Sequence, residues 1–95
     1  MSKLRRSARN EPCTLNIAGV CNYDPATVVL CHIRDFHGGG TGLKPSDLSA
    51  VFGCLHCHTH LDQHKVKGED RYFYIARAIV RTHERMVEKG LLSIA

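Results

Sequence analysis

The sequence lacks any long apolar run, and this absence excludes a membrane-embedded protein. No stretch of its 95 residues approaches the roughly 20 consecutive apolar residues that a spanning helix needs. No apolar stretch follows the basic residues near the N-terminus, so we expect no signal peptide and a cytoplasmic protein. Internal repeats, low-complexity tracts and long linkers are also missing, and the length suffices for one small core. A composition of 43% hydrophobic and 23% charged residues is that of an ordinary globular domain.

Cysteine and histidine are abundant by contrast, with five and seven residues. A core of this size leaves a small stability margin, and small domains often add a bound metal. In the cytosol, an odd number of cysteines favours metal binding or free thiols over a disulfide framework. The composition therefore points to a metal-binding domain.

Positive charge is concentrated at the two ends of the chain, whose net charge is +4. Residues 1–11 carry four basic side chains against one acidic, and residues 65–95 carry seven against four, whereas the middle is slightly acidic. This distribution suits a polyanion held by basic flanks with a cation at the centre, although a solvated basic surface is the alternative. The candidate phosphate contacts are Lys3, Arg5, Arg6, Arg9, Arg77, Arg81 and Arg85.

Local patterns predict a small α+β domain. We expect residues 1–10 to form a flexible basic arm and residues 11–95 to form the domain. A run rich in β-branched residues predicts a strand over residues 27–33. Helices are predicted over residues 57–64 and, as a long C-terminal helix, over residues 69–89.

The long helix is predicted to be amphipathic, with Gly90 ending it. Such a helix on a small core also suits a homodimer interface. The basic residues on another of its faces suit a solvated surface offset by Glu84 and Glu88 as well as they suit nucleic acid. The expected apolar face consists of Phe73, Ala76, Ile79, Val80, His83, Met86 and Val87, and there we expect His83 to be packed rather than a metal ligand.

Cys54-x-x-Cys57 is the strongest single motif. Its spacing lets both sulfurs reach one tetrahedral ion, and Cys13-x7-Cys21 offers a second pair across a hairpin-like turn. Four thiolates would close the coordination sphere, as in a structural zinc site. A thioredoxin-like redox pair and unligated cysteines are the alternatives, but no βαβ pattern surrounds Cys54. Cys31 is left over as a residue buried in the predicted strand.

Histidine and aspartate form a second constellation. His58 and Asp62 lie four residues apart on a predicted helix, so one face of it could present both to a divalent ion. His32 lies near the end of the predicted strand. His60 and His64 form another such pair, but it is offset by about 200° and cannot serve the same ion on a regular helix.

These motifs occur in a specific order. The Cys-x7-Cys turn precedes Leu30-Cys31-His32-Ile33-Arg34, which is followed by Gly-Thr-Gly-x-Lys-Pro-x-Asp-Leu over residues 40–48 and by Cys-x-x-Cys-His-x3-Asp over residues 54–62. In this series the chain resembles the HNH endonucleases, the ββα-metal class, and most closely the small prophage-encoded nucleases of the YbcO type.

The resemblance implies a zinc-stabilised ββα-metal core that hydrolyses DNA in phage recombination or processing inside a bacterial host. It makes His32 the general base, since imidazole ionises near neutral pH. It gives His58 and Asp62 a catalytic divalent ion, which would be Mg²⁺, Mn²⁺, Ni²⁺ or Zn²⁺. Asp47 takes the place of the family's central Asn and would fix the loop that bears His32 or join the metal site. The structural zinc ligands would be Cys13, Cys21, Cys54 and Cys57.

The chain departs from HNH enzymes where Cys31 replaces the Asp or His that usually precedes the general base. Because a thiol is a poor Mg²⁺ ligand, the ion is softer or a further ligand comes from Asp35, His37 or Asp47. A non-catalytic, zinc-stabilised DNA-binding or adaptor module is the competing hypothesis. A redox or metal-sensing protein that uses Cys54 and Cys57 is a third.

Overall fold

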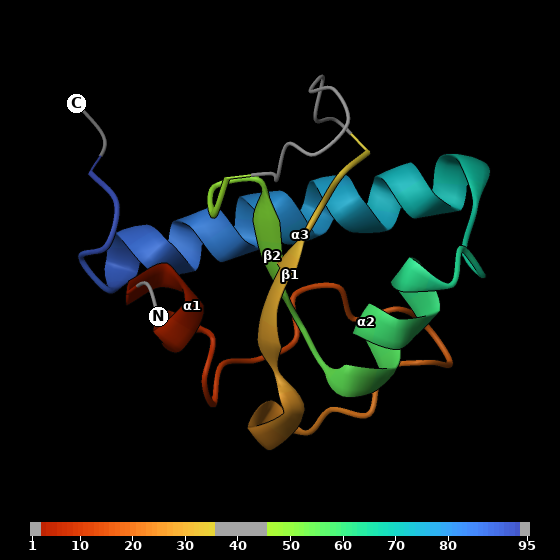
Figure 1. Ribbon diagram of the computed structural model, residues 1–95, viewed down its shortest axis with the longest axis horizontal. Helices are drawn as coiled ribbons and strands as arrows, with labels where there is room; N and C mark the ends of the chain where they lie inside the picture. The colour runs from red at the N-terminus through yellow and green to blue at the C-terminus, as the bar shows by residue number, and fades with distance from the viewer. Residues whose placement is uncertain (1–2, 36–45, 94–95) are drawn as a thin grey trace.

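The computed structural model describes residues 3–35 and 46–93 (Figure 1). A loop of about twenty residues, with one short helical turn, joins the first helix to the first strand. The elements in order are α1 (Lys3–Ser7), the 3₁₀ turn η1 (Pro25–Thr27), β1 (Val29–His32), β2 (Ala50–Gly53), α2 (Leu55–Asp62) and α3 (Gly68–Glu88). The predicted small α+β fold with a long C-terminal helix is confirmed.

The two strands form one antiparallel pair in which Val29 lies opposite Gly53 and His32 opposite Ala50. Every residue of β2 is buried, whereas β1 buries only Cys31 fully. Figure 1 shows the strands crossing α3 near its middle, with α1 and α2 on opposite sides of the pair. The core therefore lies between β2, α3 and the loop that precedes η1.

The buried face of α3 differs from the predicted one. Ile75, Ala78, Thr82 and Met86 are buried, whereas Phe73 and Val80, which were predicted to pack, are more than half exposed. The apolar pattern misled because the core side of this helix includes the polar Thr82, whose hydroxyl finds hydrogen-bond partners inside. The homodimer expected from an amphipathic helix is not tested by the structure and stays a prediction.

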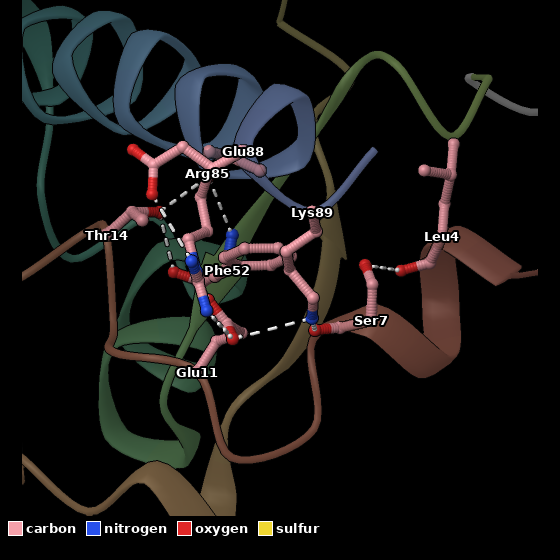
Figure 2. A network of polar contacts seen from close by, with 9 residues as sticks. Leu4, Ser7, Glu11, Thr14, Phe52, Arg85, Glu88 and Lys89 are labelled. Atoms are coloured by element: carbon pink, nitrogen blue, oxygen red, sulfur yellow. Dashed lines mark hydrogen bonds and ion pairs between the residues drawn. The ribbon is translucent and has the colours of Figure 1, made fainter. Parts of the chain in front are cut away.

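Within the segment expected to be a flexible arm, residues 1–10, Lys3–Ser7 form the helix α1. Ser7 and Ala8 are buried, and Lys89 Nζ donates to the Ser7 carbonyl at 2.7 Å. Figure 2 shows Glu11 between Lys89 and Arg85, whose Nε lies 2.6 Å from a Glu11 oxygen. These guanidinium and ammonium groups hold the pKa of Glu11 below its usual value. The ion pairs and the buried residues fix this segment against α3.

α2 begins two residues before its predicted start and ends at Asp62. Its first turn is capped by Cys54, whose Sγ accepts from the Cys57 N–H at 3.4 Å. His64 therefore lies beyond the helix, with a positive φ of 53°, and is no helical partner of His60.

No helix in residues 3–35 and 46–93 is both long and apolar enough to cross a membrane. His37, proposed as an alternative metal ligand, lies outside the described residues.

Candidate functional site

Four cysteines from two segments of the chain meet in one cluster. The sulfur atoms of this thiol centre all lie within 4.8 Å of one another, and those of Cys21 and Cys54 are 3.9 Å apart. Tetrahedral zinc–sulfur bonds of about 2.3 Å place sulfurs about 3.8 Å apart. The spacing thus fits a single tetrahedral metal ion. The ligands would be the predicted four, Cys13, Cys21, Cys54 and Cys57.

Backbone N–H groups point at these sulfurs and favour thiolates. Cys13 Sγ accepts from the N–H of Asn16 at 3.3 Å and of Cys54 at 3.2 Å, and Cys57 Sγ accepts from that of Ile17 at 3.4 Å. A hydrogen bond from the Cys57 thiol, helped by the two backbone donors, lowers the pKa of Cys13 to about 5. Burial raises the pKa of Cys21 to about 11, so the backbone donors stabilise a thiolate at Cys13, and a bound cation would be needed to hold all four sulfurs as thiolates.

Cys31 is separate from the thiol centre. It is fully buried on the core side of β1, and burial raises the pKa of its thiol well above the usual value. A Cβ on Gly53 would lie 2.7 Å from Cys31 Sγ, so a side chain there would have to displace this thiol. The prediction that Cys31 is a buried strand residue is confirmed.

A buried hydroxyl network joins the thiol centre to α3. Thr82 Oγ1 accepts from the Phe52 N–H at 3.1 Å and lies 2.8 Å from Thr14 Oγ1. Thr14 in turn donates to the Phe52 carbonyl, as Figure 2 shows. Since Thr14 directly follows Cys13, these bonds fix the first cysteine turn relative to β2 and α3.

His32 and Asp47 form a close pair where β1 ends and just before β2 begins. His32 Nε2 lies 2.7 Å from Asp47 Oδ1, and about a quarter of each side chain is exposed. The segments bearing them are tied together by Ser49, whose carbonyl accepts from the Ile33 N–H and whose hydroxyl donates to the Ile33 carbonyl. The arrangement can orient an imidazole at the surface.

His58 and Asp62 form a second pair on one face of α2. His58 Nε2 lies 3.1 Å from Asp62 Oδ2, and the Asp62 side chain is 63% exposed. The helix does bring the two predicted ligands together, so they could share an ion. Within residues 3–35 and 46–93, however, the thiol centre is the one place where three or more ligand atoms gather. His32 does not complete a three-ligand site with this pair.

A cavity of about 310 Å³ is lined by one member of each pair, His32 and Asp62. His64 lines it as well, and Arg71 closes it from α3. The guanidinium of Arg71 binds both carboxylate oxygens of Asp35, at 2.7 and 3.0 Å, and lowers the pKa of that carboxyl. Asp35 was proposed as a spare metal ligand, but it is paired with Arg71.

Sequence reasoning missed Arg71. Its NH1 also donates to the Leu61 carbonyl at 2.9 Å, so one side chain holds the segment after His32 and the end of α2 together. Only 12% of the Arg71 side chain is exposed, and 16% of that of Asp35. Nothing local in the sequence marks this pair, because its members lie 36 residues apart.

The predicted phosphate contacts fall into two groups. Lys3, Arg5, Arg6 and Arg9 are exposed on or just after α1. On α3, the guanidinium of Arg77 donates to the carbonyls of Leu15 and Asn16, and that of Arg85 pairs with Glu11. Arg81 is exposed on α3. Their contact with nucleic acid stays a prediction.

Comparison with known proteins agrees with this architecture. A solved structure from Escherichia coli K-12, described as "a putative bacteriophage protein", superimposes with a TM-score of 0.75 at 32% identity and covers 93% of this chain and 100% of that one. Two curated relatives, "Putative nuclease YbcO" from Escherichia coli K-12 and "Putative nuclease ybcO" from Enterobacteria phage 82, are each 48% identical to this chain over 63 residues. The match spans 66% of this chain and 66% of each relative, just under two thirds.

The family comparison covers more of the chain. The family model described as "Putative nuclease YbcO" matches residues 2–91. That range contains all four cysteines of the thiol centre, both histidine–aspartate pairs and the whole of α3. The chain therefore belongs to the YbcO family.

Proposed function

We propose that the protein is a metal-dependent endonuclease of the HNH type that hydrolyses DNA phosphodiester bonds, in phage or prophage DNA processing in the bacterial cytoplasm. Support comes from the nuclease names of its relatives and from the phage source of one of them. The observation that carries the proposal is the His32–Asp47 pair beside a cavity that Asp62 also lines.

The order of elements supports the HNH type. β1, β2 and α2 follow one another as two antiparallel strands and a helix, which is the ββα order. His32 ends the first strand, and His58 and Asp62 lie on the helix. A general base on the strand and metal ligands on the helix would then face one phosphodiester.

Asp47 acts on His32 as a positioning residue. An ionised carboxylate can only accept hydrogen bonds, so Asp47 selects the tautomer of His32 that carries its proton on Nε2. Nδ1 is then left with a lone pair. It would take a proton from the water whose oxygen attacks phosphorus, while the bond to the leaving 3′ oxygen breaks.

Two metal sites are part of the proposal. His58 and Asp62 would hold the catalytic divalent ion, and such an ion would supply positive charge to stabilise the charge that develops during phosphodiester hydrolysis. Their imidazole and carboxylate donors suit Mn²⁺, Ni²⁺ or Zn²⁺, and the carboxylate suits Mg²⁺. The thiol centre would hold a structural Zn²⁺, because four thiolates leave no open position for substrate.

A plasmid-nicking assay with Mg²⁺, Mn²⁺, Ni²⁺ or Zn²⁺ tests this function. We expect wild-type protein to nick supercoiled DNA, and His32→Ala to lose at least a hundredfold in rate, the usual contribution of a general base. His56→Ala is the matched control, since His56 is exposed on α2 and belongs to neither histidine–aspartate pair. DNA binding without nicking under any of these ions would instead establish the non-catalytic binding module. This second candidate, the binding module, is favoured by the small number of ligands on α2, since among the described residues only His58 and Asp62 pair there.

A further inference from the structure

The arginines at the N-terminus line a groove of their own. Its volume is about 610 Å³, and one of its walls is Arg5, Arg6 and Arg9. The rest of this α1 groove is apolar and comes from η1 and the start of β1, including Val29, which is 46% exposed. No acidic side chain lines the groove among the residues that the structure describes.

The surface around the α3 arginines has the opposite balance. The hollow that Arg81 and Arg85 line is also lined by Glu11, Glu84 and Glu88, so acidic groups outnumber basic ones. Arg85 is already paired with two of these carboxylates. Lys89 also pairs with Glu11, so the charges here nearly cancel. A phosphate chain would therefore meet little attraction here and net attraction in the α1 groove.

The α1 groove also leads to the His32–Asp47 pair. Leu30 lines the groove, and alternate residues of a strand share a face, so Leu30 and His32 lie on the same side of β1. Arg5 provides the second link, since its Nε is 3.8 Å from Asp47 Oδ1, the same oxygen that His32 Nε2 contacts at 2.7 Å. The positive wall therefore begins beside the proposed general base.

We propose that the α1 groove binds the phosphodiester backbone of the DNA strand next to the scissile phosphate, and that Arg81 and Arg85 do not bind it. The inference rests on the proposed function, because it takes DNA as the substrate. The arginines would contact phosphate oxygens, and the apolar part of the groove would lie against deoxyribose. Such contacts carry no base information, so binding in the groove is tolerant of sequence.

The test is DNA binding by the His32→Ala protein, which keeps cleavage out of the measurement. Fluorescence anisotropy of a labelled duplex, titrated at several salt concentrations, gives the affinity and the salt slope. In this background we expect Arg6→Gln and Arg9→Gln each to weaken binding several-fold and to reduce the slope by about one, as the loss of one phosphate contact does. Arg81→Gln removes the same charge from α3 and should leave both quantities unchanged.

Each result decides between the groove and the function. If Arg81→Gln weakens DNA binding as much as Arg6→Gln does, the groove is not the DNA-binding site. The same conclusion follows if Arg6→Gln and Arg9→Gln both leave DNA binding unchanged. If binding depends on Arg6 and Arg9 but the wild-type protein nicks no plasmid, the groove remains a DNA-binding site and the nuclease function is rejected. No DNA binding at all would overturn both. Far-UV circular dichroism of each variant checks that the exposed substitutions leave the fold intact.

Discussion

The thiol centre and the histidine site share α2 but are built differently. The thiol centre sits at the start of the helix, and its four sulfurs converge within 4.8 Å, two of them from fully buried residues. The histidine site lies further along the helix and consists of two separate pairs, one of them with an aspartate 63% exposed. The first is complete from the protein's own ligands, whereas the second leaves room for solvent and substrate.

This difference separates stability from chemistry within 95 residues. A closed four-thiolate site can serve the fold, and an open site of oxygen and nitrogen ligands can serve a reaction. α3 supports both, through Thr82 on the thiol side and Arg71 on the histidine side. The comparison therefore predicts that damage to one site leaves the other measurable.

The largest effect is expected from removing the zinc ion that we propose for the thiol centre. Zinc-finger sites contribute about 10–16 kcal/mol of apparent binding free energy, which matches or exceeds the roughly 5–15 kcal/mol of net stability of a typical domain. A chelator, or Cys54→Ser, should therefore abolish the cooperative thermal transition in circular dichroism and the bound zinc in elemental analysis.

Cys31→Ala is the matched control, because it removes a buried thiol outside the centre. It should keep one zinc per chain and a cooperative transition at a lower temperature. His58→Ala, at the other site, should also keep one zinc per chain and a cooperative transition, with little change in the transition temperature. A folded, cooperative protein after complete zinc removal would contradict the division of roles.

Thr82→Val is expected to have the next largest effect. The change keeps the shape of the side chain but leaves the Phe52 N–H without its acceptor, at a cost of about 1–3 kcal/mol in the free energy of unfolding. Urea denaturation with zinc bound measures this cost. Thr59→Val, at an exposed position of α2, should cost much less. Nicking activity per folded molecule should be unchanged, since the hydrogen-bond partners of Thr82 are Thr14 and Phe52 and not the two histidine–aspartate pairs.

The sequence predicted the thiol centre better than the histidine site for a physical reason. Metal-ligand spacing is a local property, so Cys54-x-x-Cys57 and the turn from Cys13 to Cys21 could be read directly as two halves of one site. The ion pair of Asp35 with Arg71 depends on tertiary contact, and no local pattern encodes it.

The element boundaries show the same limit. The long helix was predicted to within one residue at each end, because its length and period are local signals. Its buried face was not, since burial of Thr82 depends on partners in β2 and in the first cysteine turn. The helical turn of α1 was missed for a similar reason, because ion pairs and burial against α3 hold that segment in place.

The smallest effect on stability, and the sharpest test of the separation, is expected from Arg71→Lys. Lysine keeps the charge but cannot bind both oxygens of Asp35 and the Leu61 carbonyl at once, so the free energy of unfolding should fall by only about 1 kcal/mol. The nicking rate should fall by a larger proportion than this small loss of stability explains, because Arg71 no longer holds the segment after His32 and the end of α2 together. Arg81→Lys, exposed on the same helix, should change neither quantity. Zinc content should remain at one per chain in both variants, and a loss of zinc in Arg71→Lys would show that the two sites are coupled through α3 rather than independent.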